Sequence, residues 1–243
     1  MSSWELIIDG PADGTSNMAI DAALLDEVEN SPEPQTIVRF YQWVRPTVSL
    51  GRNQQIGKAV DTAYCAANGI DIVHRPTGGR AVLHDDELTY AVISNDVSHF
   101  GDTIYGNYKR VSEALCAAFR RVGVDAVLAC DTRKPSMEGL EKDPPCFVST
   151  SRYELMVNGR KIVGSAQRRL RRSFLQHGSM PIVSDPERLA RVTKIGDAAL
   201  LRAEMAGVTE FLPERPTIEG LTNAMVEAFR DYFSIEFRPR RML

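Results

Sequence analysis

Cysteine is scarce in this chain of 243 residues, which has only four, at positions 65, 116, 130 and 146. They are far apart and include no Cys-x-x-Cys pair, so the sequence argues against a zinc knuckle or a disulfide framework. Cys65 and Cys116 fall within helical patterns, and we expect both thiols to behave as small buried apolar residues. Cys130 has no assigned role.

Long apolar runs and export signals are also missing. No stretch approaches the ~18 apolar residues that a membrane helix needs. Residues 1–6 have neither the basic start nor the apolar core of a signal peptide. A formal net charge of −3 gives no reason to expect general affinity for nucleic acid. We therefore expect a cytoplasmic protein that binds neither membranes nor nucleic acid.

The composition that is present, 43% hydrophobic and 25% charged, is ordinary for a globular protein with a sizeable core. No linker-like stretch or internal repeat divides the chain, so we expect one domain over residues 1–243. Alternating patterns predict strands at 4–9, 36–41, 47–50, 70–74, 81–84, 88–94, 124–129, 153–157, 161–163 and 173–182, with a strand or tail at 234–238. Helical spacing predicts helices at 17–29, 60–68, 104–122, 186–192, 195–205 and 218–233.

A pair of glycines, Gly78-Gly79, lies between two of the predicted strands. Glycines adopt backbone angles forbidden to other residues, and they bring main-chain N–H groups close to whatever lies beside the loop. A plain glycine turn between strands is an equally good interpretation of the pair alone. The Gly-Lys-Ser/Thr ending of a phosphate loop is missing, which excludes a nucleoside triphosphatase of that kind.

Cys146 and Lys161 are the candidates for chemistry. Cys146 follows Asp143-Pro144-Pro145, and consecutive prolines disfavour a helix, so this thiol is expected on a loop. Asn158-Gly159 is the dipeptide best suited to a two-residue hairpin turn, and it places Lys161 just past that turn. A loop thiol followed by a rigid hairpin with a lysine indicates a nucleophile whose thiolate is stabilised by a cation.

Four arginines stand close together at positions 168, 169, 171 and 172. Such a run is usually a solvated face, but guanidinium groups bind carboxylates and phosphates bidentately, so the run can also dock an acidic protein surface. Gly178 is expected to break the strand over residues 173–182, with His177 at the bulge or end. For His84 and His177, a satisfied buried hydrogen bond is the default interpretation, and His99 has no assigned role.

Three segments resemble the biotin/lipoate protein ligase catalytic-domain family: HRPTGGRAVLHD at 74–85, NGRKIVGSAQ at 158–167 and LQHGS at 175–179. The likeness runs to about Val192, which implies a core at about 4–192 and a C-terminal helical extension at about 193–243. It is closest to the family's cysteine-dependent octanoyltransferases, because Cys146 precedes Lys161 at the separation they show. The implied fold is α/β (α+β), a single domain with a largely antiparallel, mixed central sheet flanked by helices.

The resemblance also implies the chemistry, which needs no metal, nucleotide or other cofactor. The Cys146 thiolate, its pKa lowered by Lys161, takes an octanoyl group from acyl carrier protein and passes it to a lysine of a lipoyl domain. The acceptor would be a protein such as glycine cleavage H protein or the E2 subunit of a 2-oxoacid dehydrogenase. The implied substrate-binding positions are Arg75, Thr77, Gly78, Gly79, His84, Gly164, Ser165, Ala166, His177 and Gly178.

Three other functions remain open. An ATP-dependent lipoate–protein ligase would form an acyl-adenylate, hold its phosphate with the same lysine and leave Cys146 incidental, although the end at Leu243 leaves little room for the accessory domain of many such ligases. An octanoyl amidotransferase between two lipoyl-carrying proteins would differ only in its donor. A catalytically inactive module would bind an acyl group or a carrier protein without turnover, which the presence of both Cys146 and Lys161 disfavours.

Overall fold

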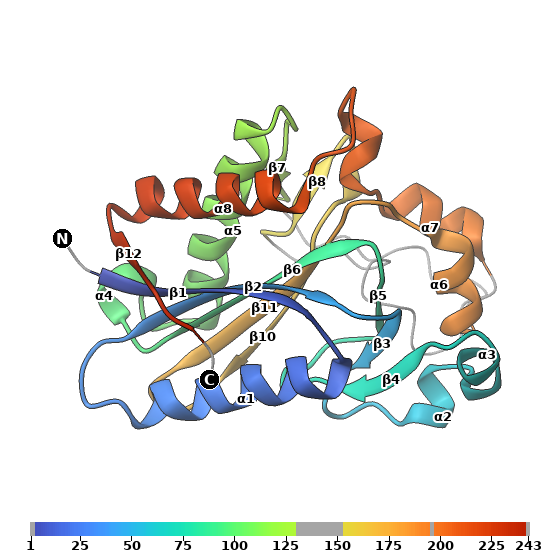
Figure 1. The fold of residues 1–243 in the computed structure, drawn as a ribbon, viewed down its shortest axis with the longest axis horizontal. Helices are drawn as coiled ribbons and strands as arrows, with labels where there is room; N and C mark the ends of the chain where they lie inside the picture. The colour runs from blue at the N-terminus through green and yellow to red at the C-terminus, as the bar shows by residue number, and fades with distance from the viewer. Residues whose placement is uncertain (1–2, 130–152, 195–196, 242–243) are drawn as a thin grey trace.

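The structure, a computed structural model, describes residues 3–129, 153–194 and 197–241 (Figure 1). A six-stranded sheet with the order β10-β11-β6-β2-β1-β12 runs through its middle. Its strands are β1 (Ser3–Ala12), β2 (Thr36–Trp43), β6 (Glu87–Ser94), β10 (Gly164–Arg169), β11 (Phe174–Pro181) and β12 (Glu236–Pro239). The strands from β10 to β2 pair antiparallel, whereas β1 pairs parallel with β2 and β12. The predicted mixed, largely antiparallel sheet is confirmed.

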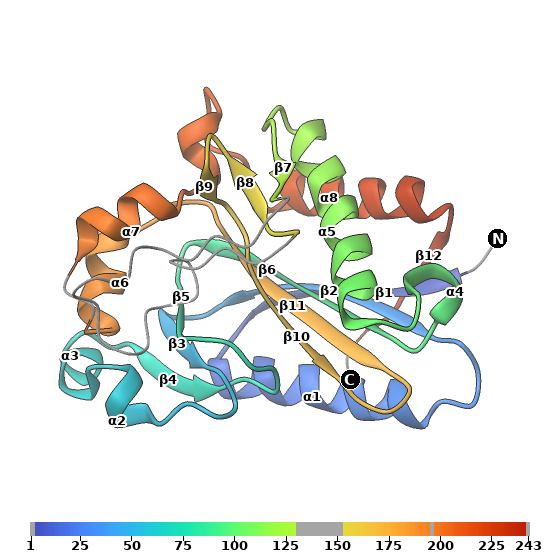
Figure 2. The same ribbon diagram turned by 180° about the vertical axis from the view of Figure 1, so that it is seen from behind.

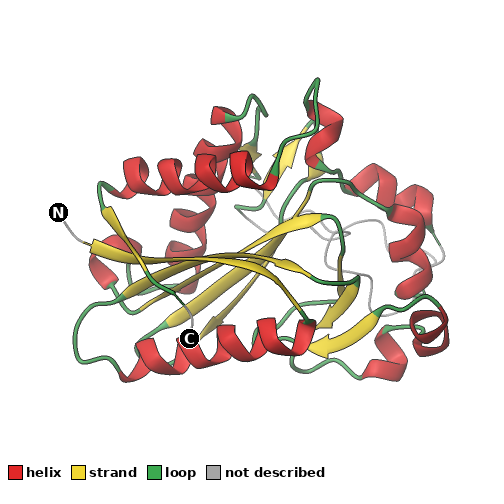
Figure 3. Ribbon diagram, viewed as in Figure 1, coloured by secondary structure: helices red, strands yellow, loops and turns green. Residues whose placement is uncertain are grey.

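Helices cover both faces of this sheet (Figure 3). Helix α1 (Gly14–Asn30) packs on one face, and the other carries α4 (Val97–Phe100), α5 (Ile104–Arg121) and α8 (Ile218–Phe233). Each long helix begins at a side-chain cap: Asp13, Thr103 and Thr217 accept N–H groups of the first turn. Because strand residues alternate between faces, neighbours such as Tyr90 and Ala91 belong to opposite core clusters.

A smaller sheet with the order β4-β3-β5 lies at one end of the main sheet (Figure 1). It comprises β3 (Thr47–Leu50), β4 (Asp71–His74) and β5 (Val82–His84), and the helices of this end are α2 (Ile56–Ala59), α3 (Thr62–Ala67), α6 (Pro186–Val192) and α7 (Ala198–Glu204). A third sheet joins β7 (Val127–Leu128), β8 (Leu155–Val157) and β9 (Arg160–Lys161). A 3-10 helix, η2 (Val208–Phe211), precedes α8.

The β8–β9 hairpin has the predicted tight turn. Asn158 and Gly159 have φ angles of 50° and 79°, the left-handed conformation that such a turn requires at both central residues. Lys161 therefore follows the turn as predicted, in register with Met156 on the neighbouring strand. Its carbonyl also accepts the N–H of Ala206, so both sides of the lysine's backbone are held.

Gly178 does not break β11, and that prediction is wrong. The strand keeps its register through Gly178, which pairs with Ser165 on β10 and Tyr90 on β6. A Cβ atom here would lie 2.6 Å from Cε1 of Tyr90 and 2.8 Å from Oγ of Ser165. Close packing across the sheet requires the glycine, because any side chain would displace the tyrosine ring or the serine.

Other predicted boundaries shift for local reasons. The helix expected over 60–68 is α3, which begins at Thr62 because Asp61 accepts the N–H of Tyr64 and caps it; the short helix α2 precedes the expected range. The strand expected over 124–129 is only β7, and the arginine run begins inside β10. Beyond residue 192, α8 packs in the main core and β12 joins the sheet. Within the residues that the structure describes, no helix is long and apolar enough to span a membrane.

Candidate active site

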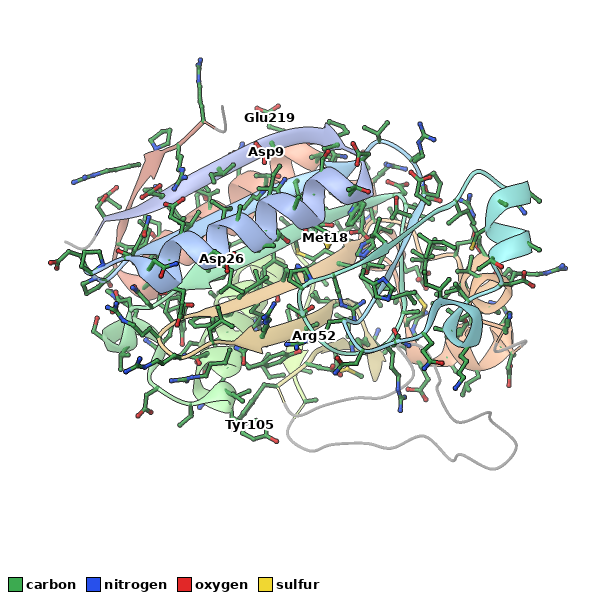
Figure 4. The ribbon with its side chains drawn as sticks, turned by 90° about the horizontal axis from the view of Figure 1, so that it is seen from below. Asp9, Met18, Asp26, Arg52, Tyr105 and Glu219 are labelled. Carbon is green, nitrogen blue, oxygen red and sulfur yellow. The ribbon has the colours of Figure 1, made fainter. Side chains whose placement is uncertain are left out.

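A pocket lies where the small sheet meets the edge of the main sheet. Seven residues predicted to bind substrate line it: Arg75, His84, Gly164, Ser165, Ala166, His177 and Gly178. Met18 reaches the pocket from α1 (Figure 4). The other lining residues are Tyr41, Ser49, Val82, Thr89 and Ser179. Thr77, Gly78 and Gly79 are not among the lining residues, and they form the loop that Arg75 holds.

Arg75 is buried, and its N–H groups donate hydrogen bonds mainly to the backbone of this glycine loop. Its Nη2 donates to the carbonyls of Gly78 and Arg80 at 2.8 and 2.7 Å, and its Nη1 donates to the carbonyl of Ser49 at 2.9 Å. Gly79 has a φ of 87°, and a Cβ on Gly51 would lie only 2.0 Å from the Gly79 carbonyl oxygen. The loop thus depends on Gly51 and Gly79 for its close approach to β3.

His177 stands at the centre of the first of two buried hydrogen-bond chains. Its Nδ1 lies 2.8 Å from a carboxylate oxygen of Asp21 on α1, and its Nε2 lies 2.7 Å from the hydroxyl of Thr77. Asp21 also accepts from Arg39 and from the hydroxyl of Tyr41. Because the carboxylate can only accept, Nδ1 carries the proton and Nε2 accepts the Thr77 hydroxyl.

Burial and Arg39 set the protonation states of the residues in this hydrogen-bond chain. Burial lowers the pKa of His177 below its usual value, although the hydrogen bond to Asp21 opposes the shift. Burial also works against ionisation of Asp21, but the hydrogen bond from His177 and the Arg39 guanidinium hold its pKa below the usual range. The chain is therefore a carboxylate, a neutral imidazole and a hydroxyl, ending where Nε of Arg75 donates to Thr77.

His84 stands in the second chain. Its Nδ1 lies 2.8 Å from Glu87 and its Nε2 lies 2.8 Å from the hydroxyl of Ser49, which in turn accepts from Nη1 of Arg75. The ring stacks on Trp43 with 4.1 Å between centroids. Both chains therefore meet at Arg75, and the polar groups of the pocket wall are bonded to one another. A wall of satisfied polar groups offers a ligand mainly apolar contact.

Lys161 is buried without exposed surface and pairs with Glu154. Its Nζ lies 2.6 Å from a carboxylate oxygen of Glu154, and both side chains are inaccessible or nearly so. Since Lys161 is opposite Met156 in the hairpin, Glu154 stands diagonally across on the same face, within reach of a long side chain. Burying two charges requires them to be paired, and this pair meets that requirement.

Tyr90 is buried behind the pocket wall and hydrogen-bonded to one of its residues. Its hydroxyl lies 2.8 Å from the hydroxyl of Ser165, a lining residue, and accepts from the amide of Gln176 at 3.0 Å. Burial raises the pKa of Tyr90 to about 12, with hydrogen bonds from Ser165 and Gln176 opposing and the charge of Glu154 adding to the rise.

The predicted nucleophile, Cys146, lies outside the described residues, and so do Cys130 and Arg152. Cys65 and Cys116 are buried as predicted, and burial raises the pKa of both thiols. Among the residues that the structure describes, no group of three or more His, Cys, Asp or Glu side chains is arranged to hold a metal ion.

Sequence reasoning missed several polar residues that build the site: Asp21, Tyr41, Ser49, Glu87, Tyr90 and Glu154. Glu154 had a usable signal, because a two-residue turn at Asn158-Gly159 fixes the register and brings positions 154 and 161 to one face. Asp21 had none. It stands 156 residues before His177, on a helix whose position over the sheet no local pattern gives.

The sequence similarity of the chain to curated octanoyltransferases, together with its mixed sheet between helix layers, shows an acyltransferase enzyme of the α/β class. More particularly, the chain belongs to the lipoyl protein ligase A/B catalytic domain family, whose sequence model matches residues 13–230. The chain is 37% identical over 245 residues to Octanoyltransferase LipM of Moorella thermoacetica, covering 98% of this chain and 89% of that protein.

Two solved structures share the fold over the whole chain. One is a lipoate-protein ligase A bound with ATP, with a TM-score of 0.80, 26% identity and coverage of 100% of this chain and 90% of that one. The other is from Thermoplasma acidophilum, a bi-partite lipoate protein ligase described with its E2 lipoyl domain. It has a TM-score of 0.80, 25% identity and coverage of 100% and 88%.

Proposed function

We propose that this enzyme transfers an octanoyl group from octanoyl carrier protein to a lysine of a lipoyl domain, through a thioester on Cys146. The observation that carries the proposal is Lys161, an ammonium group without exposed surface that is paired with Glu154 and stands three residues before Gly164 in the pocket wall. Similarity to Octanoyltransferase LipM of Moorella thermoacetica supports octanoyl as the group transferred.

The first step forms the acyl-enzyme. The Cys146 thiolate attacks the carbonyl carbon of the donor thioester, the new carbon–sulfur bond forms, and the donor's carbon–sulfur bond breaks to release a thiol after protonation. A thiol of reference pKa ~8.5 is mostly protonated at neutral pH, so a nearby ammonium raises the thiolate fraction. Lys161 is the residue that we assign to this task.

The second step moves the acyl group to the acceptor. The neutral amine of the lipoyl domain's lysine attacks the thioester carbonyl, an amide bond forms, and Cys146 leaves as a thiolate. The nitrogen of the acceptor loses one proton as the tetrahedral intermediate collapses, and this proton passes to the leaving sulfur or to solvent. The E2 lipoyl domain described with the Thermoplasma ligase supports a lipoyl domain as the acceptor.

The pocket suits the proposed acyl chain because its wall offers little to a polar ligand. Arg75, His84 and His177 are held by loop carbonyls, carboxylates and hydroxyls, while Met18, Val82 and Ala166 contribute apolar contact. Each methylene that leaves water for such a site contributes about 0.8 kcal/mol. An acyl chain that binds through its methylenes needs no charged group at the far end of the pocket.

Mass spectrometry of a lipoyl domain tests the proposal. The domain is mixed with the enzyme and octanoyl carrier protein in the absence of ATP. We expect one octanoyl group to be added, and C146S to abolish the addition. A parallel reaction replaces octanoyl carrier protein with an octanoylated lipoyl domain as the donor. An amidotransferase would use this donor in preference to the carrier protein.

A second candidate function is an ATP-dependent ligase, favoured by the structural likeness to a lipoate-protein ligase A bound with ATP. In that case Lys161 would hold a phosphate and Cys146 would be dispensable. Free octanoate with ATP would then modify the lipoyl domain in the C146S enzyme as well, and octanoyl carrier protein without ATP would not.

A further inference from the structure

The arginines of the β10–β11 hairpin have no part in the acyl chemistry. We infer that Arg168, Arg169, Arg171 and Arg172, the hairpin arginines, dock the acidic carrier protein that delivers the acyl thioester. This inference rests on the proposed function and deepens it, because it names the surface that receives the donor. Figure 2 shows the hairpin at the edge of the main sheet, with α5 beside it.

The charge of this hairpin is not balanced within the protein. Residues 164–181 contain four arginines and no aspartate or glutamate. In the part of the chain that the structure describes, none of the hairpin arginines forms an ion pair with a carboxylate, whereas five surface arginines elsewhere do: Arg121, Arg160, Arg188, Arg202 and Arg215. The nearby carboxylate of Glu29 accepts backbone N–H groups of Arg172 and Ser173. The guanidinium groups therefore present net positive charge outward.

The hairpin arginines begin beside the pocket. Strand β10 opens with Gly164, Ser165 and Ala166 in the pocket wall, and at about 3.3 Å per residue Arg168 follows within about 7 Å. Its Nη1 contacts the carbonyl of Pro76 on the glycine loop at 3.4 Å. Its buried Nε has no hydrogen-bond partner among the described residues. Arg168 thus stands between the pocket wall and the exposed end of the hairpin.

Arg169 contacts the helix that carries two exposed apolar side chains. Arg169 donates to the side chain of Asn107 at 3.2 Å, on the first turns of α5. Just before Asn107, Ile104 and Tyr105 are 56% and 69% exposed, and Tyr105 projects away from the ribbon (Figure 4). Arg171 and Arg172 are exposed at the hairpin end. Arginine and tyrosine are enriched in protein interfaces, so this combination fits a protein partner better than a lone anion.

The two substrates of the proposed reaction differ in the charge that they bring to the pocket. The donor delivers its acyl group on a phosphate-linked arm from an acidic protein. The acceptor must present a lysine amine, which is cationic at neutral pH before it reacts. A row of guanidinium groups leading to the pocket attracts the first and repels the second. The hairpin arginines are therefore assigned to the donor.

Charge reversal at the hairpin end tests the inference. The variant R171E/R172E changes two exposed side chains, and R238E/R241E is the matched control, since Arg238 and Arg241 are exposed at the opposite edge of the same sheet. Binding of octanoyl carrier protein is measured by titration calorimetry at low salt. We expect R171E/R172E to bind at least tenfold more weakly and the control to stay within twofold of the unmodified protein. The difference should shrink in about 0.5 M salt.

A second readout compares donors. The ratio of kcat/KM for octanoyl carrier protein to that for octanoyl-pantetheine, which lacks the protein, should fall at least tenfold in R171E/R172E and stay unchanged in the control. Unaltered carrier-protein binding by R171E/R172E would overturn the inference. Weakened binding of the lipoyl domain in place of the carrier would overturn the choice of partner. Carrier binding without any acyl transfer would leave the docking surface intact and reject the proposed function.

Discussion

At position 161 a lysine is closed off from solvent, and Glu154 supplies a carboxylate 2.6 Å away. One residue earlier on the same hairpin, Arg160 pairs with Glu210 at 2.7 Å near the surface. The two pairs have similar geometry and differ in burial. The cost of removing a partner from a buried pair is several times that at a surface, because the remaining charge stays in a poorly solvated site.

We therefore expect E154Q to lower the free energy of unfolding by about 3 kcal/mol. The matched variant E210Q should lower it by less than about 1 kcal/mol. Urea denaturation at pH 7.5 measures both. Equal effects would show that burial of Lys161 is not what makes its partner necessary.

A double variant separates this structural effect from catalysis. E154L/K161M replaces the buried charges with apolar side chains of similar length and should recover most of the lost stability. The same protein should not recover acyl transfer, because Cys146 would lack its proposed cation. Recovery of transfer would remove Lys161 from the mechanism.

The two glycines of the loop are not equivalent. Gly79 has a φ of 87°, and a Cβ there would lie 2.8 Å from Nη2 of Arg75, while a Cβ on Gly78 meets no atom within 4 Å. We expect G79A to lower the free energy of unfolding by about 1–3 kcal/mol and G78A to change it by less than about 0.5 kcal/mol. Thermal and urea unfolding would compare the two, and a larger loss in G78A would contradict the geometry.

Among single residues, the sequence predicted those marked by local chemistry. The tight turn at Asn158-Gly159, the lysine after it and the glycine pair all follow from backbone preferences within a few residues. Glu154 was within reach of the same reasoning. Asp21 was not, because its contact with His177 depends on how α1 lies on the sheet.

At the scale of elements, α1 and β11 are joined through the neutral His177 and the carboxylate of Asp21. Because burial lowers the pKa of His177, the unfolded chain binds a proton as the pH falls through about 6.5 while the folded protein resists it. The contribution of the neutral His177 to the free energy of unfolding is therefore fully present above this pH and declines below it. The decline approaches about 1.4 kcal/mol per pH unit until the folded histidine is also protonated.

Urea denaturation between pH 7.5 and 5 would measure this slope. H177N keeps a donor toward Asp21 but cannot titrate, so its stability should depend less on pH over this range. An unchanged slope in H177N would show that another group causes the acid sensitivity.

The boundaries of elements were predicted less well than their existence. Asp61 caps α3, so the helix that hydrophobic spacing predicts over 60–68 begins at Thr62. Gly178 looks like a strand break because glycine weakens strands, yet here the neighbours Tyr90 and Ser165 occupy the space of its side chain. In both cases, the contact that sets the structure cannot be predicted from hydrophobic periodicity.

Across the whole molecule, the two ends of the chain meet at one edge of the main sheet. Strand β12 pairs with β1 over four register positions, and Arg240 bonds Glu5 and Glu27 at 2.8 and 2.7 Å. Ile235, just before β12, is buried in the main core. The sequence predicted a strand or tail here, and it did not reveal that the pairing would be parallel to the first strand.

Removal of residues 235–243 should therefore lower the free energy of unfolding by about 2–4 kcal/mol, since each strand hydrogen bond contributes about 1 kcal/mol and Ile235 loses its burial. R240A, which removes only the partly exposed ion pairs, should cost less than about 1 kcal/mol. Guanidinium denaturation would compare the two. An equal loss in both proteins would attribute the effect to the charges and not to the strand.

The mixed α/β fold could be expected from the order of strands and helices together with the family likeness, and the site could be expected at the level of its motifs. The carboxylates of Asp21, Glu87 and Glu154, which orient His177, His84 and Lys161, emerge only when separate elements are packed together. The fold thus supplies the positioning groups around side chains that the sequence already marks.

The most direct measurement is intact-mass spectrometry of the enzyme after it is mixed with octanoyl carrier protein, without ATP or acceptor. We predict the gain of one octanoyl group on Cys146 that hydroxylamine removes and that addition of a lipoyl domain transfers to its lysine. An enzyme that modifies the lipoyl domain at full rate while Cys146 is never acylated, or is replaced by serine, would contradict the account.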